Sequence, residues 1–171
     1  MRVVAAGDGD LQIVIELLSA ASRRMAVRGV AFWWDPFPPD EVQESIARKE
    51  TFLAYREDTV VGTIAVGWSD EPIWGARPPD AGYIHRLAVA TDVVGAGIGT
   101  SILDWAAEDI RGHGRSWIRL DTIAPDEGPR ASLHRWYKQH GFSRVGEVDA
   151  PIVGEGSELI FYRTILYERK A

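Results

Sequence analysis

The chain has no cysteine among its 171 residues, and this absence excludes several kinds of chemistry. Without cysteine there is no disulfide framework, no thiolate nucleophile and no cysteine-ligated zinc. Long hydrophobic runs are also absent, because the apolar stretches are interrupted well short of the roughly 20 residues that a membrane span requires. The N-terminal residues 1–10 lack the apolar core of a signal peptide. These absences predict a cytoplasmic protein with no membrane partner.

Positive charge is in the minority: Lys and Arg number 19 against 25 Asp and Glu, which gives a formal net charge of −6. Because nucleic-acid binding needs a net basic face, we expect no nucleic-acid partner. A content of 46% hydrophobic and 26% charged residues is typical of a soluble globular protein. The length suffices for one well-buried domain and is short for two, so we expect a single domain over residues 1–171. We expect this domain to be a monomer or a homodimer.

Two common catalytic arrangements are also missing. The four histidines form no H-E-x-x-H motif or comparable ligand cluster, so no metal is expected. Ser101 and Ser132 lack the G-x-S-x-G setting of a serine hydrolase. Neither metal-assisted nor serine-based hydrolysis is therefore predicted.

What is present is a glycine-rich loop between a β-prone apolar run at residues 87–90 and a helical apolar pattern from Ile98 onward. Glycines stand at positions 95, 97 and 99. Glycine allows backbone N–H groups to turn toward a bound anion, and the start of a helix adds unpaired N–H donors and a positive dipole end. The segment predicts a cradle for a phosphate or pyrophosphate group, and the alternative is a strand-to-helix turn that binds no ligand.

The spacing of these glycines distinguishes between known phosphate-binding loops. The dinucleotide fingerprint G-x-G-x-x-G is broken, because Thr100 stands at its third glycine position, and a P-loop would need a lysine that the segment lacks. Residues 94–99, Val-Gly-Ala-Gly-Ile-Gly, resemble the [R/Q]-x-x-G-x-[G/A] signature of the GCN5-related N-acetyltransferases (GNAT family). Val94 departs from this signature at the Arg or Gln position, so the pyrophosphate would rely on backbone donors.

A second segment, residues 133–142, resembles a later helix of the same family, which reads roughly N-x-x-[A/L]-x-x-[L/W/Y]-Y-x-x-x-G-F. Apolar and aromatic residues recur in it at helical spacing, and Gly141 is predicted to follow the end of the helix. Tyr137 matches the tyrosine of the family motif. Arg130 stands where the family has an asparagine, seven residues before that tyrosine.

The resemblance implies that the chain binds acetyl-CoA as a cosubstrate. The implied coenzyme contacts are Leu87, Ala88, Val89, Val94, Gly95, Ala96, Gly97, Ile98, Gly99, Thr100 and Arg130. Because CoA is anionic, an acidic chain must supply local positive potential for it. The implied activity is direct transfer of an acetyl group to a primary amine of a small molecule or of a peptide N-terminus. The alternative is a non-catalytic acyl-CoA-binding domain that serves as a sensor or interaction module.

Amide formation from a thioester needs a base for the amine and an acid for the departing thiolate. We expect His85 to be the base, because an unperturbed imidazole titrates near pH 6.5 and the resemblance implies that the strand before the glycine loop faces the acceptor. Asp121 and Glu57 are weaker alternatives, and a half-buried structural role for His85 is also open. The resemblance assigns the acid role to Tyr137, because the family tyrosine often protonates the coenzyme thiolate.

The connection between the first two predicted helices supplies candidates for the acceptor site. The resemblance places this connection beside the acceptor, and its candidate residues are Trp33, Trp34 and Asp35. The tryptophans would form an apolar wall, and Asp35 would attract an ammonium group. The alternative is that the tryptophans anchor a long loop to the core.

The hydrophobic patterns predict the order of strands and helices, and the resemblance implies an α/β fold of the mixed α+β kind, with a mostly antiparallel sheet of six to seven strands and about four helices. We expect strands at residues 2–6, 51–56, 60–68, 83–89, 117–122, 142–148 and 159–167, and helices from about 11 to 28, 40–49, 97–111 and 133–140. Residues 69–80, with three prolines and a glycine, are predicted to be a loop. The order β-α-α-β-β-β-α-β-α-β-β is that of the resembling family.

Overall fold

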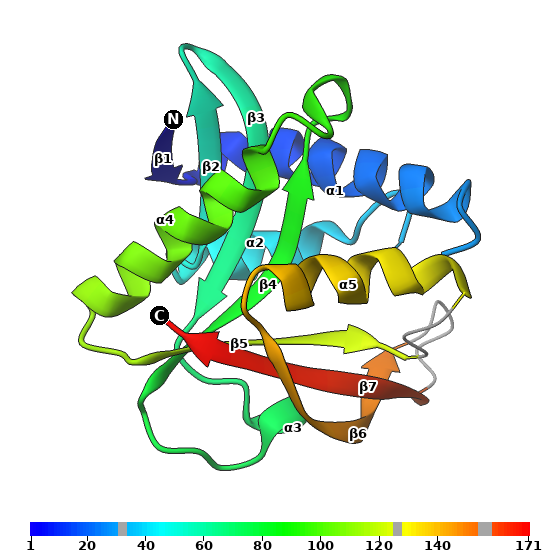
Figure 1. Ribbon diagram of the computed structural model, residues 1–171. Helices are drawn as coiled ribbons and strands as arrows, with labels where there is room; N and C mark the ends of the chain where they lie inside the picture. The colour runs from blue at the N-terminus through cyan, green and yellow to red at the C-terminus, as the bar shows by residue number, and fades with distance from the viewer. Residues whose placement is uncertain (31–33, 125–127, 154–158) are drawn as a thin grey trace. The chain divides into compact units, whose positions relative to one another are not determined.

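The structure is a computed structural model that describes residues 1–30, 34–124, 128–153 and 159–171 (Figure 1). Its contacts divide the chain into two compact units, residues 1–67 with 84–109 and residues 68–83 with 110–171. Strand β4 (Ala81–Val89) contributes residues to both units. The seven strands follow the order β1-β2-β3-β4-β5-β7-β6 in the sheet, which confirms the predicted mixed α/β fold.

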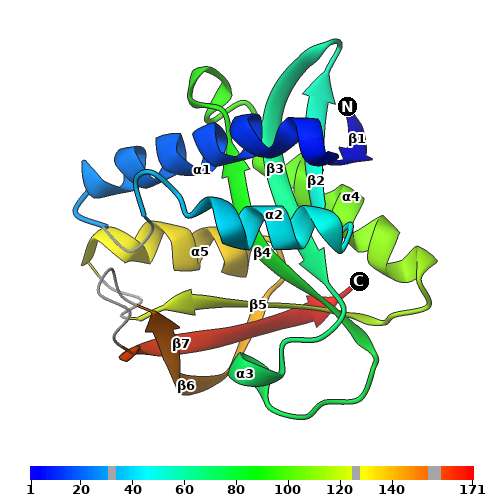
Figure 2. The same ribbon diagram turned by 180° about the vertical axis from the view of Figure 1, so that it is seen from behind.

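The first unit places helices on both faces of its strands. It contains β1 (Arg2–Ala5), α1 (Leu11–Ala26), α2 (Pro39–Ala47), β2 (Thr51–Arg56), β3 (Thr59–Gly67), the larger part of β4 and most of α4 (Ile98–Gly112). Antiparallel pairing sets Leu53 of β2 opposite Val4 of β1 and Thr63 of β3. Helices α1 and α2 lie on one face of these strands and α4 lies on the other (Figures 1 and 2).

The glycine loop is held at both of its ends by close packing in this unit. A Cβ atom at Gly62 of β3 would lie 2.7 Å from Cδ1 of Ile102 in α4 and 2.7 Å from the carbonyl oxygen of Ala88 in β4. Such short distances exclude a larger residue at position 62 unless its neighbours shift. The end of β4 and the first turns of α4 are therefore fixed against β3, and the loop that joins them starts and ends at fixed points.

The second unit contains α3 (Glu71–Trp74), the first residues of β4, β5 (Trp117–Ile123), α5 (Ala131–Gln139), β6 (Ser143–Val153) and β7 (Leu159–Lys170). Strand β7 pairs antiparallel with both β5 and β6. Helix α5 packs on β7 through His134, whose Nδ1 lies 3.0 Å from the buried Tyr167 hydroxyl. Gly141, which follows the C-cap residue His140, has a φ of 83°, a conformation that favours glycine and agrees with its predicted place after the helix.

A buried arginine fixes β5 within the second unit. Arg119 is 5% exposed, and its guanidinium pairs with Asp80 at 3.0 Å and with Glu168 of β7 at 3.2 Å. Its Nη1 also donates a hydrogen bond to the Tyr83 hydroxyl at 3.2 Å. A buried charge that is paired and hydrogen-bonded in this way sets the position of the strand that carries it.

The observed elements differ from the predicted ones mainly between residues 69 and 80, which were expected to be a loop. The short helix α3 lies there, with the backbone N–H of Trp74 donating to the Asp70 carbonyl at 2.8 Å. Strands β6 and β7 also extend several residues further than predicted. Among the residues that the structure describes, no helix is long and apolar enough to cross a membrane.

Candidate active site

The glycine loop is open to solvent at the positions that the sequence singled out. Gly95 and Gly97 have φ values of 87° and 77°, a backbone conformation that favours glycine. A Cβ atom built on either glycine would meet no atom of the described residues within 4 Å. Val94 is 47% exposed, and α4 begins at Ile98 directly after the loop. This geometry leaves room for a ligand beside the backbone at the start of α4.

Two of the predicted coenzyme contacts have their side chains in the core. Ala88 is 3% and Ile98 is 5% exposed, so only their backbone groups can face a ligand. The remaining predicted contacts on β4 and α4 are half-buried: Leu87, Val89, Gly99 and Thr100. Ala96 is exposed, and its N–H donates to the Val93 carbonyl at 3.2 Å within the turn before the helix.

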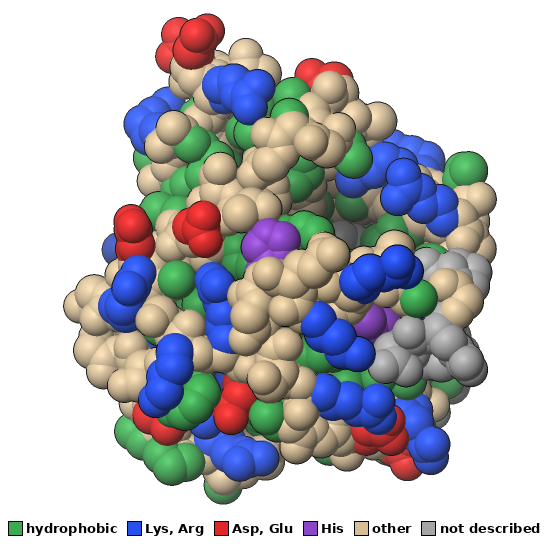
Figure 3. Space-filling model, in the orientation of Figure 1, with side chains coloured by type: hydrophobic (Ala, Val, Ile, Leu, Met, Phe, Trp, Pro, Cys, Tyr) green, Lys and Arg blue, Asp and Glu red, His purple; other side chains and the backbone are tan. Residues whose placement is uncertain are grey.

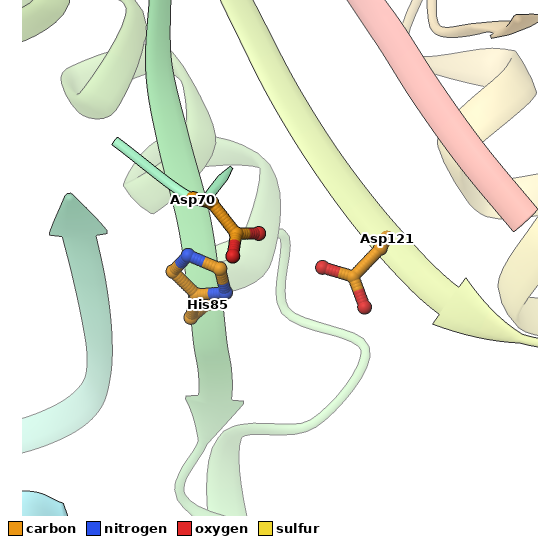
Figure 4. Close-up of side chains that lie close together, drawn as sticks. All are labelled: Asp70, His85 and Asp121. Carbon is orange, nitrogen blue, oxygen red and sulfur yellow. The ribbon is translucent and has the colours of Figure 1, made fainter. Parts of the chain in front are cut away.

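His85 lies on β4 and is half-buried (Figure 4). Burial, and then the positive charge of Arg86, lower the pKa of His85 to about 4. This pKa lies below that of an ordinary imidazole, and the side chain is neutral at pH 7, as a base must be. Arg86 has a φ of 52°, so the regular alternation of the strand is interrupted directly after His85.

Tyr137 lies on α5 in the second unit, half-buried among aromatic rings. Its ring centroid lies 5.2 Å from that of Trp136, 5.7 Å from that of Phe142 and 6.3 Å from that of Tyr167. Burial, and then the negative charge of Asp121, raise the pKa of the Tyr137 hydroxyl above its ordinary value. The hydroxyl therefore keeps its proton at neutral pH, as a proton donor must.

Asp121 of β5 and Asp70, the residue before α3, form a carboxylate pair in the second unit (Figure 4). A carboxylate oxygen of one lies within 4.8 Å of a carboxylate oxygen of the other. Burial, and then the negative charge of Asp70, raise the pKa of Asp121 to about 7. Burial raises the pKa of Asp70 to about 6. Two interacting carboxyl groups of this kind titrate together close to neutral pH.

This pair can do two things chemically. Carboxylate oxygens are ligands for hard cations and ammonium groups, and a carboxylate with a pKa near 7 is matched to proton transfer at neutral pH. Sequence reasoning named Asp121 and missed Asp70, because one aspartate before a short Glu-Pro segment carries no recognisable motif. Glu57, the other alternative base, is exposed in the turn between β2 and β3.

The predicted acceptor residues have different surroundings in the structure. Trp34 is half-buried against the core of the first unit, with its ring 5.5 Å from the ring of buried Phe37. Asp35 is exposed, and its Oδ1 lies 2.6 Å from Nη1 of Arg23. Trp33 lies outside the described residues. The core contact of Trp34 agrees with the alternative in which this residue anchors the loop.

Arg130, the residue at the family's asparagine position, precedes α5 in the second unit. Its Nη1 donates a hydrogen bond to the Ala124 carbonyl at 2.7 Å. This bond joins the end of β5 to the start of α5, so Arg130 has a structural role in addition to the proposed coenzyme contact.

The chain matches a known protein family over more than half of its length. The family model of the acetyltransferase (GNAT) domain matches residues 47–144, which include the glycine loop and Tyr137. The chain therefore belongs to the GNAT acetyltransferase family, whose general activity is acetyl-CoA-dependent N-acetyl transfer.

Two relatives from Bacillus subtilis (strain 168) are similar over most of their length. One, named uncharacterized N-acetyltransferase YesJ, is 25% identical over 146 residues, which are 80% of this chain and 78% of that protein. The other, named S-(2-succino)cysteine N-acetyltransferase, is 24% identical over 168 residues, which are 95% of this chain and 94% of that protein.

Solved structures of the family share the fold. A GNAT-family acetyltransferase from Listeria monocytogenes superposes with a TM-score of 0.78 at 20% identity, covering 99% of this chain and 94% of that one. The acetyltransferase yncA from Salmonella typhimurium, solved with acetyl-CoA, gives a TM-score of 0.67 at 16% identity, covering 99% and 93%. At these identities the likeness shows the fold alone.

Proposed function

We propose that this chain transfers the acetyl group of acetyl-CoA directly to a primary amine of a small molecule or of a peptide N-terminus. The observation that carries the proposal is the exposed loop at residues 94–97. Its two glycines have positive φ values and open space beside them, and α4 begins directly after the loop. The N-terminus of a helix, with a glycine loop before it, is suited to bind phosphate groups through backbone N–H donors. Membership of the GNAT family makes acetyl-CoA the ligand to expect there.

The thiolate of the coenzyme must be protonated as the amide forms, and we assign this step to Tyr137. The hydroxyl is protonated at neutral pH, so it has a proton to give to the sulfur as the carbon–sulfur bond breaks. The reaction joins the amine nitrogen to the acetyl carbon and breaks the carbon–sulfur bond. The amine proton goes to a base and the tyrosine proton goes to sulfur.

For the base, the pKa values favour Asp121 over His85. The pKa of Asp121 is about 7, whereas that of His85 is about 4, and a base is most effective when its pKa lies near the working pH. Asp70 beside Asp121 supports the raised value. A carboxylate pair also suits a cationic amine, because an ammonium group is attracted before it loses its proton.

The name of one relative supports a small-molecule acceptor. This relative is named for the N-acetylation of a modified cysteine, a small molecule with a primary amine. Its identity to this chain is only 24%, so the particular acceptor is not carried over.

The test is acetyl-CoA turnover against a panel of amino acids, polyamines and short peptides, with the free thiol measured. The proposal expects stoichiometric thiol release and N-acetyl product for at least one class of amine. The matched pair Gly97→Glu and Gly97→Ala checks the loop, because both carry the same backbone strain and only glutamate brings charge and bulk toward the phosphates. Acetyl-CoA binding without turnover on any amine would instead support a non-catalytic acyl-CoA-binding domain.

A further inference from the structure

Arg24, near the C-terminal end of α1, contacts the residues that lead into the glycine loop. Its Nη2 donates to the Val89 carbonyl at 3.1 Å, and its Nη1 donates to the Thr91 hydroxyl at 2.9 Å. Val89 is the last residue of β4, and Thr91 begins the short 3-10 turn (Thr91–Val93) that precedes Val94. A cation from α1 is therefore fixed at the entrance of the loop, within the first unit.

Two cations lie close together at this place. The pKa of Arg24 is lowered first by burial and then by the positive charge of Arg28. Arg28 is exposed, and Figure 3 shows Lys and Arg side chains gathered over the end of α1. The two positive charges repel each other, and a bound anion would offset this repulsion.

The loop itself supplies no charged side chain at the position where its family signature has Arg or Gln. Val94 stands there, and it is 47% exposed. The chain as a whole carries a net charge of −6, which repels an anionic coenzyme at long range. Residues 91–100 contain no Lys or Arg, so a positively charged side chain beside the loop belongs to another element.

We propose that Arg24, assisted by Arg28, supplies to the phosphate groups of acetyl-CoA the positive charge that Val94 does not supply. The inference rests on the proposed function, because it requires that the loop at residues 94–97 holds the coenzyme. A guanidinium presents a rigid fork of N–H donors that suits phosphate oxygens. Its bonds to Val89, Thr91 and the Ala20 carbonyl fix the guanidinium before the ligand arrives, which lowers the entropic cost of binding, and they leave the remaining N–H groups for phosphate oxygens.

The test compares Arg24→Gln with Arg23→Gln by calorimetric titration of acetyl-CoA. Arg23 is the neighbouring arginine, and it pairs with Asp35 instead of contacting the loop, so it is a matched control for net charge. Arg24→Gln should weaken acetyl-CoA binding by about 10- to 100-fold and reduce its dependence on salt. Arg23→Gln should stay within about twofold of the parent, and Val94→Arg added to Arg24→Gln should recover most of the lost affinity.

A second ligand separates a phosphate contact from a structural role. S-acetyl-pantetheine lacks the nucleotide and its phosphates, so Arg24→Gln should leave its binding unchanged. Equal weakening of both ligands would show that Arg24 only ties β4 to α1 and would overturn the proposal, as would unchanged acetyl-CoA affinity. If Arg24→Gln does not fold, the exposed Arg28→Gln takes its place, and the proposal then requires weaker acetyl-CoA binding with a smaller salt slope. A parent protein that binds no acetyl-CoA would overturn the proposed function itself.

Discussion

Tyr137 of α5 and Asp121 of β5 are electrostatically coupled: after burial, the negative charge of Asp121 is the second cause that raises the pKa of the Tyr137 hydroxyl. Asp121 is in turn coupled to Asp70, whose charge raises the pKa of Asp121. The second unit thus holds a protonated phenol near a carboxyl that ionises at about pH 7. At neutral pH the phenol therefore carries a proton, and the ionised carboxyl can accept one.

Tyr137→Phe removes only the hydroxyl and keeps the ring that packs against Phe142 and Tyr167. We expect kcat to fall by about 10²- to 10⁴-fold, the usual range for a general acid, with little change in acetyl-CoA affinity or melting temperature. Steady-state kinetics and calorimetry on the same preparation measure both. A kcat within about threefold of the parent would remove Tyr137 from the proton transfer.

The pH dependence of kcat/KM distinguishes the two candidate bases, because it reports the pKa values of the free enzyme. A base acts in its deprotonated form, so kcat/KM should fall as the pH drops through about 7 if Asp121 is the base and through about 4 if it is His85. We expect the fall near pH 7. We also expect Asp121→Asn to lower kcat by about 10²- to 10⁴-fold, and His85→Gln to retain the fall in activity near pH 7. A fall in activity near pH 4 that disappears in His85→Gln would instead identify His85 as the base.

The raised pKa of Asp121 also predicts a dependence of stability on pH. The folded-state pKa of about 7 exceeds the ordinary value of 3.8, so between these pH values the folded protein binds more protons than the unfolded chain. The group therefore destabilises the fold increasingly as the pH rises from about 4 to about 7, and by a constant amount above that.

Asp121→Asn should consequently stabilise the protein at pH 8 by about 1–3 kcal/mol, and the gain should shrink toward pH 4. Urea unfolding at several pH values measures this difference. The exposed Asp58→Asn, in the turn after β2, controls for loss of one negative charge and should show no such trend. A gain that is equal at pH 4 and pH 8 would mean that ionisation of Asp121 is not its cause.

Much of the fold could be predicted because its elements are long and strongly patterned. Strand β2 was expected at residues 51–56 and is observed at Thr51–Arg56, and α4 was expected at 97–111 and is observed at Ile98–Gly112. Helix α3 was missed because it has four residues with a proline in its first turn, too few for a periodic pattern. The end of β7 was missed because Glu168 and Arg169 are polar, although Trp117 of β5 pairs opposite Lys170.

The candidate site could be predicted only where its signal is local. The glycine loop lies within a few consecutive residues, so its spacing alone indicated a ligand. The contact of Arg24 with Thr91 joins residues 67 positions apart, and no pattern along the chain announces it. The low pKa of His85 and the raised pKa of Asp121 depend on burial by distant segments, so composition and periodicity cannot indicate them.

The ion pair between Arg23 and Asp35 gives a test of the acceptor site with two variants of opposite effect. If Asp35 attracts the ammonium group of the acceptor, Arg23 competes with the acceptor for the same carboxylate oxygen at 2.6 Å. We therefore expect Asp35→Asn to raise the acceptor KM and Arg23→Gln to lower it, each by about two- to tenfold, with kcat and acetyl-CoA affinity unchanged. Both side chains are exposed, so neither variant should change the stability by more than about 1 kcal/mol. Steady-state kinetics with a cationic acceptor measure both effects, and an acceptor KM that moves in the same direction in both variants, or in neither, would exclude Asp35 from the acceptor site.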